Sequence, residues 1–164
     1  MGILVRRIEK GDLGEVCAMW SALGQMFPCE EYQEGLGQKM TPERLFLLAP
    51  SLNPRSVLEV LVAEIDGQVV GFVDFTVPGS GHIPMKDVIY IGELFVKPEH
   101  RGRGVGTALV KEVVRIGREK SDEWGVRRIV TNAGDEAFHE SLGFMPMRNP
   151  QRQKVPMWSH EYLL

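Results

Sequence analysis

Residues 93–109, ELFVKPEHRGRGVGTAL, change from an apolar, strand-like run to an amphipathic, helix-like run through a glycine-rich turn. Three alternating glycines and two arginines make up this turn: Gly102, Gly104, Gly106, Arg101 and Arg103. A plain turn needs one or two glycines, and each glycine loses more conformational entropy on folding than any other residue. The pattern therefore indicates that a large anionic group lies against bare backbone at this junction.

Four explanations of the turn compete. A strand-to-helix turn without a ligand leaves the three glycines unexplained. A Rossmann fingerprint requires a third glycine where this chain has Thr107, and it normally stands in an opening βαβ unit rather than at mid-chain. A P-loop requires Gly-Lys-Ser/Thr, which does not occur here. The fourth explanation is a diphosphate cradle of another kind, and it is the one we favour.

Such a cradle depends on the start of the predicted helix. The amides of residues 102–107 would lie at its N-terminus, where they lack intrahelical partners and carry partial positive charge. Arg101 and Arg103 would add charge-assisted contacts to phosphate oxygens, although Arg103 also fits a solvated surface position.

Length and composition narrow the class of protein. The chain has 164 residues, and we predict a single domain over 1–164. A net charge of −3 argues against a sequence-independent nucleic-acid binder. Two cysteines, Cys17 and Cys29, favour reduced thiols in a cytoplasmic protein. We find no metal-ligand spacing, no signal-peptide pattern and no apolar run of the about 18 residues needed to span a membrane.

The order of predicted elements gives a mixed α/β sheet. A first strand (ILVRRIE) precedes a helix, for which Asp12 and Glu15 suggest a capping box and Gly24 an end. Thr41-Pro42 begins a short helix through Leu48. Two β-branched runs flank the hairpin turn Asp66-Gly67. The predicted second half holds a long strand (DVIYIGELFV), an amphipathic helix, a strand (RRIVTN), a short helix (DEAFHESLGF) and a last strand (KVPMWSHEYLL).

Three features of the second half predict its local structure. Gly92 lies within the long strand and predicts a bulge or a close backbone approach. The strand–helix–strand order predicts one βαβ crossover, in contrast to an antiparallel first half. On the amphipathic helix, Val105, Leu109 and Val113 share one face, which predicts the buried side.

Two segments together resemble the GNAT superfamily of acetyl-coenzyme A-dependent N-acetyltransferases. RGRGVG fits the signature (Arg/Gln)-x-x-Gly-x-(Gly/Ala), and ELFVKPEH is similar to the strand that precedes it in that family. NAGDEAFHESLGF is similar to the family pattern of an Asn, a short helix and Tyr-Glu-x-x-Gly-Phe. The resemblance covers residues 88–144 and implies the GNAT fold, with acetyl-coenzyme A as co-substrate.

The resemblance also implies which residues hold the cofactor. It assigns the diphosphate to the amides from Gly102 to Thr107, including Val105 and Gly106. It assigns the pantetheine arm and the acetyl group to the edge formed by Leu94, Phe95 and Val96. Asn132 matches the family's Asn after the next strand, where its amide would bond the pantetheine, although it also fits a strand-end cap.

Acetyl transfer to an amine requires a base, because a free alkyl amine has a pKa of about 10.4 and is mostly protonated at neutral pH. Glu93, within an apolar strand, is our candidate, and a bulge near 92–95 would supply an amide for the oxyanion. A second group must protonate the leaving thiolate. His139 falls where many relatives have Tyr, and a histidinium would donate that proton. Tyr90 and Tyr162 are reserve donors, and each of these residues also fits a purely structural role.

The acceptor is the least defined part of the prediction. We predict a primary amine of a small molecule (a polyamine, an aminoglycoside or an amino-acid derivative) or of a peptide. The resemblance implies that residues 25–55 and 145–164 form the wall of the acceptor cleft, and the candidate residues there are Phe27, Tyr32, Trp158, His160 and Tyr162. An acidic rim formed by Glu30, Glu31 and Glu34 is a further option. The alternative function is a non-catalytic coenzyme A-binding module, and a homodimer is compatible with either function.

Overall fold

The computed structural model describes residues 2–26, 41–48, 58–76, 87–132, 135–147 and 159–164. The strands are β1 (Leu4–Arg7), β2 (Leu58–Ile65), β3 (Gln68–Thr76), β4 (Val88–Val96), β5 (Arg128–Thr131), β6 (Met145–Pro146) and β7 (His160–Leu163). The α-helices are α1 (Leu13–Met26), α3 (Pro42–Leu48), α4 (Val105–Trp124) and α5 (Glu136–Ser141). Two 3₁₀ turns, η1 (Lys10–Asp12) and η2 (Pro98–His100), precede α1 and the glycine-rich turn.

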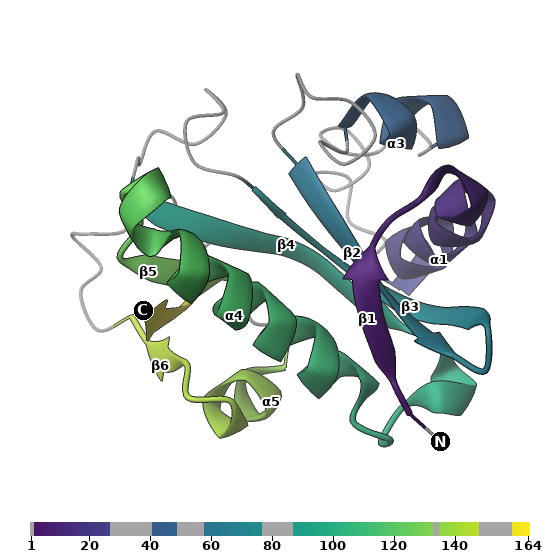
Figure 1. Cartoon of the computed structure of the whole chain (residues 1–164). Helices are drawn as coiled ribbons and strands as arrows, with labels where there is room; N and C mark the ends of the chain where they lie inside the picture. Colours follow the sequence, from purple (N-terminus) through teal and green to yellow (C-terminus); the bar gives the residue numbers. More distant parts are fainter. Residues whose placement is uncertain (1, 27–40, 49–57, 77–86, 133–134, 148–158) are drawn as a thin grey trace.

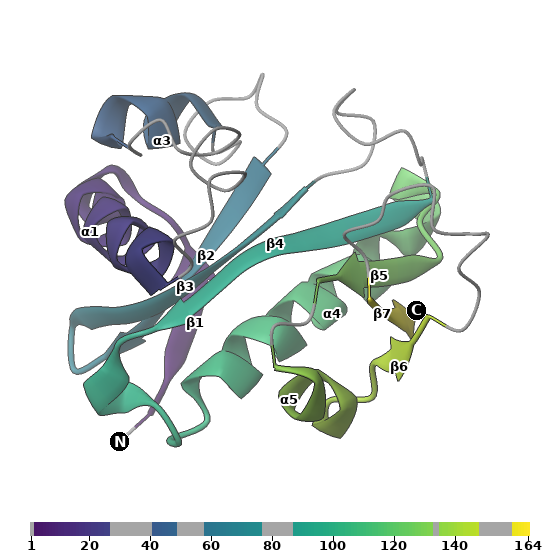
Figure 2. The same ribbon diagram turned by 180° about the vertical axis from the view of Figure 1, so that it is seen from behind.

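The described strands form one mixed sheet in the order β1-β2-β3-β4-β5-β7-β6. Helices α1 and α3 cover one face of this sheet, while α4 and α5 cover the other (Figures 1 and 2). The pairs β1–β2, β2–β3 and β3–β4 are antiparallel, whereas β4 and β5 pair in parallel. Helix α4 connects those two parallel strands, so the predicted βαβ crossover and the mixed α/β fold are both confirmed.

The hairpin β2–β3 has the predicted two-residue turn. Asp66 and Gly67 have φ angles of 50° and 79°, which is the left-handed pair that a tight hairpin turn requires. From there the two strands pair from Ile65 with Gln68 to Leu58 with Thr76, with one shift of register between Ala63 and Glu64. This hairpin places β3 directly beside β4, which carries the predicted site.

Each face of the sheet has its own apolar core. On the α4 face, the helix buries Val105, Leu109 and Val113, as their spacing predicted. On the α1 face, Trp20 stacks on Phe72 of β3, with ring centroids 5.1 Å apart. Because side chains alternate along a strand, β2, β3 and β4 supply residues to both cores in turn. The sheet therefore separates the two cores, and the position of a residue in the alternation along its strand decides which face its side chain lies on.

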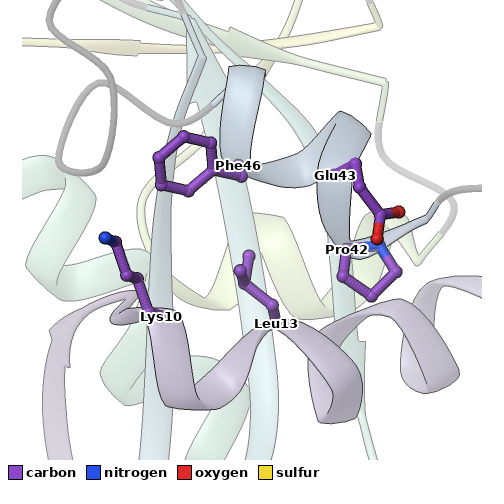
Figure 3. A pocket seen from close by; sticks show the side chains of 5 residues that line it. All are labelled: Lys10, Leu13, Pro42, Glu43 and Phe46. Carbon is purple, nitrogen blue, oxygen red and sulfur yellow. The ribbon is translucent and has the colours of Figure 1, made fainter.

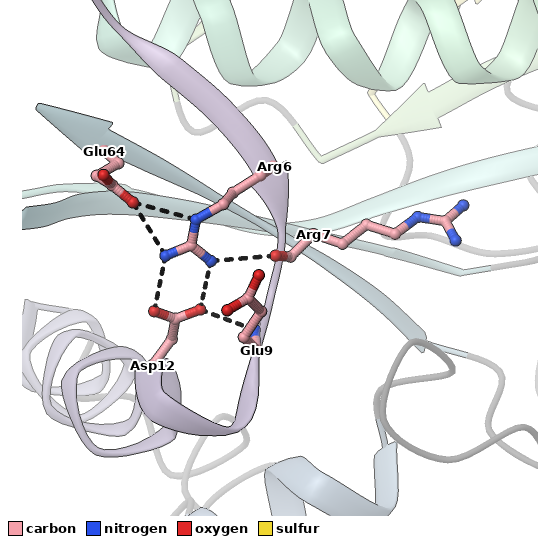
Figure 4. A network of polar contacts seen from close by, with 5 residues as sticks. All are labelled: Arg6, Arg7, Glu9, Asp12 and Glu64. Atoms are coloured by element: carbon pink, nitrogen blue, oxygen red, sulfur yellow. Dashed lines mark hydrogen bonds and ion pairs between the residues drawn. The ribbon is translucent and has the colours of Figure 1, made fainter. Parts of the chain in front are cut away.

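An ionic network fastens the start of α1 to the sheet (Figure 4). Arg6 on β1 donates to both carboxylate oxygens of Asp12, at 2.7 and 3.0 Å, and to Glu64 on β2 at 3.1 Å. Asp12 also accepts the amide of Glu9 at 2.7 Å. The predicted capping box of Asp12 with Glu15 is wrong, because Asp12 forms its capping box with Glu9 and its carboxylate points back toward β1. Two smaller differences are that α1 passes Gly24 and that β6 was not predicted.

Candidate active site

The glycine-rich turn has the backbone that its sequence predicted. Gly102 and Gly104 have φ angles of 69° and 84°, a conformation that residues with a Cβ atom rarely adopt. A Cβ atom built at either position would meet nothing within 4 Å, so the turn faces open space. Gly104 caps α4, and the amide of Ala108 donates to its carbonyl at 2.9 Å. The amides of residues 105–107 therefore precede the helix's hydrogen-bond ladder.

The side chains around the turn have different surroundings. Arg101 donates from Nε to the Val96 carbonyl at 2.9 Å, and its guanidinium lies over the Phe95 ring. It thus ties the end of β4 to the turn, in addition to any contact with a ligand. Arg103 is exposed, whereas Val105 is buried in the core, so Val105 offers only its amide to the turn's open side.

Strands β4 and β5 separate beside this turn. Their parallel pairing runs from Val88 with Arg128 to Ile91 with Thr131, after which β4 continues through residues 92–96. Asn132 follows β5 at this point and is exposed. The three residues assigned to the cofactor edge lie on the extension of β4. Leu94 and Val96 are half-buried, but the Phe95 side chain is 5 % exposed and packs in the α1-side core. Of Phe95, therefore, only the backbone is available for the predicted contact with the cofactor.

The bulge predicted at Gly92 is confirmed. Pairing of β3 with β4 shifts between Val73 and Phe75, which pair with Leu94 and Ile91. Asp74 lies between them and is only 3 % exposed. Its Oδ2 atom accepts the amide of Glu93 at 3.0 Å. Sequence reasoning missed Asp74, because an acidic residue in a strand resembles an ordinary solvent-facing position.

The carboxyl groups near the bulge influence each other. Burial first, and then the charge of Glu93, raise the pKa of Asp74 well above its usual range. Tyr90 belongs to the same group of side chains: burial, Asp74 and Glu93 raise its pKa to about 12. At neutral pH the Tyr90 phenol is therefore protonated, and Asp74 is shifted toward its protonated form. Glu93 remains half-buried at the point where β4 leaves β5.

The predicted proton donor, His139, is buried in an aromatic cluster of α5. Its side chain packs edge-on against Phe138 and Phe144, and the residue is 5 % exposed. Its Nδ1 atom lies 2.9 Å from the Asp135 carbonyl and therefore carries the proton, which leaves Nε2 as a buried atom without a hydrogen-bond partner. Burial lowers the pKa of His139, and His160 adds to this effect. A histidinium donor at neutral pH, as predicted from the sequence, is thus disfavoured.

This burial predicts a pH effect on folding. We expect wild type to lose more stability than His139→Phe when the pH falls from about 7.5 to 5.5. Because the folded-state pKa of His139 lies below 6.5, the unfolded chain binds more protons in this interval. The destabilisation begins as the pH falls through about 6.5 and is complete below the folded-state pKa. Denaturant unfolding of both proteins at the two pH values measures it; equal losses would contradict the buried neutral state.

Most of the chain matches a known family of acetyltransferases. A family model described as the acetyltransferase (GNAT) family matches residues 20–144. The chain belongs to the GNAT family. The resemblance predicted from RGRGVG and NAGDEAFHESLGF is therefore confirmed, and the sheet with its single crossover is the GNAT fold.

Individual relatives show how far the likeness to GNAT proteins extends. An uncharacterized N-acetyltransferase of Methanocaldococcus jannaschii is 36% identical over 89 residues, which cover 51% of this chain and 37% of the relative. Aminoglycoside N(6')-acetyltransferase type 1 of Klebsiella aerogenes is 28% identical over 156 residues, covering 94% and 97%. The structure of PaiA N-acetyltransferase from Thermoplasma acidophilum in complex with coenzyme A has a TM-score of 0.67 at 20% identity, over 100% of both chains. The chain thus spans well under half of the archaeal relative but nearly all of the bacterial one.

The residues of this GNAT chain fit coenzyme A at the predicted place. The open space outside Gly102 and Gly104 leaves room for a diphosphate against the backbone, and the amides at the head of α4 are donors of suitable charge. The separation of β4 from β5 adds an extended edge beside Glu93. The described residues contain no group of three or more His, Cys, Asp or Glu side chains suited to a metal ion.

Other predicted residues lie elsewhere. His160 is 2 % exposed, with its Nδ1 atom 2.9 Å from the hydroxyl of Ser159, and Tyr162 contacts Arg118 on the α4 face. The His160 side chain is thus buried and the Tyr162 hydroxyl is bonded to Arg118, while their place in the cleft wall stays a prediction. Cys17 is a free, buried thiol whose pKa is raised by burial. Residues outside the described part of the chain include the following predicted ones: Phe27, Cys29, Glu30, Glu31, Tyr32, Glu34 and Trp158.

A separate apolar pocket lies between α1 and α3 (Figure 3). It is lined by Lys10, Leu13, Pro42, Glu43 and Phe46, with the Lys10 ammonium 5.4 Å from the centre of the Phe46 ring. None of the predicted cofactor or catalytic residues belongs to it. Among the helices that the structure describes, none has both the length and the apolar character to cross a membrane.

Proposed function

We propose that this protein transfers the acetyl group of acetyl-coenzyme A directly to a primary amine of a small molecule. The observation that carries the proposal is the juxtaposition at β4. The glycine-rich turn with its exposed amides continues from the end of this strand, while Glu93 lies at the bulge where the same strand leaves β5. One strand therefore connects a diphosphate cradle to a carboxylate.

Cofactor binding is assigned to backbone groups first. The amides of residues 102–107 hold the diphosphate, and Arg101 and Arg103 add positive charge. The edge formed by Leu94, Phe95 and Val96 holds the pantetheine arm, with the Asn132 amide opposite. The bound cofactor supplies an activated acetyl thioester, and the remaining chemistry belongs to the chain's own groups.

Glu93 is the proposed base. Burial and the charge of Glu93 raise the pKa of its neighbour Asp74, which argues against Asp74 as the proton acceptor and leaves Glu93 as the candidate. An ionised carboxylate in this position attracts an ammonium ion and accepts its proton, which frees the amine lone pair for attack. Neutral His139 cannot protonate the leaving coenzyme A thiolate, because its Nδ1–H is bonded to the Asp135 carbonyl and its Nε2 carries no proton. Tyr90, whose phenol stays protonated, is therefore the proposed donor to this thiolate.

The acceptor class follows from this chemistry and from the relatives. A carboxylate base selects a substrate that arrives as a cation, which suits an aminoglycoside, a polyamine or an amino-acid derivative. The Klebsiella relative is named for an aminoglycoside, and a relative from Sus scrofa, 28% identical over 131 residues, is named thialysine N-epsilon-acetyltransferase. A cytoplasmic location, a homodimer and the single domain over 1–164 remain predictions.

Thiol release from acetyl-coenzyme A on a panel of amines tests the proposal. We expect at least one small cationic amine to release thiol above the hydrolysis background, with a matching mass gain of one acetyl group. The panel includes aminoglycosides, diamines, lysine analogues and a peptide N-terminus. Coenzyme A binding without turnover on any of these amines would favour the alternative, a non-catalytic coenzyme A-binding module of the same fold.

A further inference from the structure

Asp74 is an unusual residue for the middle of a sheet. It lies on β3, between β2 and β4, and is 3 % exposed. Because side chains alternate along a strand, Asp74 projects to the same face as Phe72, which packs in the α1-side core. A carboxyl group in such a place is costly to bury unless it is hydrogen-bonded.

Its contacts are with the bulge of β4. The Oδ2 atom accepts the Glu93 amide at 3.0 Å, and the Oδ1 atom lies against Gly92. A Cβ atom at position 92 would stand 2.2 Å from Oδ1 and 3.2 Å from Cγ, so no other residue fits there without displacing Asp74. The glycine and the carboxyl group are therefore complementary parts of one local arrangement.

The electrostatic surroundings of Asp74 do not explain its presence by a gain in folding stability. Burial and the charge of Glu93 both oppose its ionisation, and only the Glu93 amide favours it. An apolar side chain in this place would avoid the cost of desolvation, although it would leave the Glu93 amide without its acceptor. What Asp74 supplies is thus a fixed position for one peptide group, the one that carries the proposed base.

We propose that Asp74 is a positioning residue for acetyl transfer: its carboxyl group fixes the bulge of β4 and so orients Glu93 toward the reacting amine. This inference rests on the proposed function. It also refines the oxyanion prediction, because the Glu93 amide is already used by Asp74. Of the amides of residues 92–95, that of Glu93 is therefore not the oxyanion donor.

Four variants test the proposal by turnover. Asp74→Ala removes the acceptor and Gly92→Ala displaces it, so we expect each to lower kcat at least about tenfold with the KM for acetyl-coenzyme A within about threefold. Asp74→Asn keeps a carbonyl acceptor, and its kcat should stay within about threefold of wild type. Gly14→Ala on α1 meets nothing within 4 Å and is the matched glycine control, with kcat unchanged.

A fifth variant separates positioning from general destabilisation. Val62→Ala opens the fully buried core on the α1 face and lowers the melting temperature without contact to Glu93's amide. Assayed well below its melting temperature, it should retain the wild-type kcat. An equal loss of kcat in Val62→Ala and Asp74→Ala would show that Asp74 contributes to folding stability only and does not position Glu93.

Amide hydrogen exchange provides a readout that does not need catalysis. In wild type and Asp74→Asn the Glu93 amide should be protected, and in Asp74→Ala it should exchange at least about tenfold faster. If Asp74→Asn is as slow in turnover as Asp74→Ala, or if neither Asp74→Ala nor Gly92→Ala changes kcat, the positioning role is wrong. If wild type acetylates no amine, the proposed function fails. If the Glu93 amide exchanges as slowly in Asp74→Ala as in wild type, the hydrogen bond from this amide to Asp74 is refuted independently of catalysis.

Discussion

Replacing Gly104 by valine is expected to weaken coenzyme A binding about 10- to 100-fold, which corresponds to the loss of one hydrogen bond to a charged group. Two effects act together. The φ angle of 84° at Gly104 is strained for any residue with a Cβ atom, and the new side chain would occupy the open space outside the turn. Isothermal titration with coenzyme A measures the change.

The same helix supplies the control for backbone strain. Gly125 caps the other end of α4 with a φ angle of 65°, and a Cβ atom there also meets nothing within 4 Å. Gly125→Val should therefore lose a similar amount of stability but bind coenzyme A as tightly as wild type. Equal affinities of the two variants, whether both normal or both weakened, would argue against a diphosphate at the head of α4.

The parts of the fold that sequence reasoning predicted correctly are those encoded locally. Asp66-Gly67 can form a tight turn between two β-branched runs whatever surrounds it, and it does. The spacing of Val105, Leu109 and Val113 likewise selects one face of α4 before any partner is known. The glycine-rich turn belongs to the same class, because a left-handed φ angle is a property of the residue itself.

The parts that sequence reasoning missed depend on segments distant in the chain. Asp74 is functional only because the pairing of β3 with β4 shifts at that point, and nothing in GFVDFTV reveals the shift. The family resemblance places His139 at the position of a proton donor, but burial lowers its pKa and His160, which arrives on β7, adds to this effect. Register and burial are tertiary properties, so the resemblance assigned the position of His139 but not its charge.

Changing Glu93 to glutamine is expected to lower kcat about 100- to 10,000-fold, the range for loss of a general base, while coenzyme A affinity stays unchanged. Glutamine keeps the size and the backbone amide that Asp74 accepts, so the bulge should survive. What disappears is the proton acceptor. The lost rate should recover partly at high pH, where the amine loses its proton to solvent.

Glu99→Gln is the matched control for this change. Glu99 is exposed on η2, a few residues beyond the end of the same strand, and it loses the same charge. Its kcat should equal that of wild type, which separates a specific base from a general loss of negative potential near the substrate. A Glu93→Gln enzyme with wild-type kcat at neutral pH would exclude Glu93 as the base, and with Asp74 shifted toward its neutral form the proton would then have to leave through water.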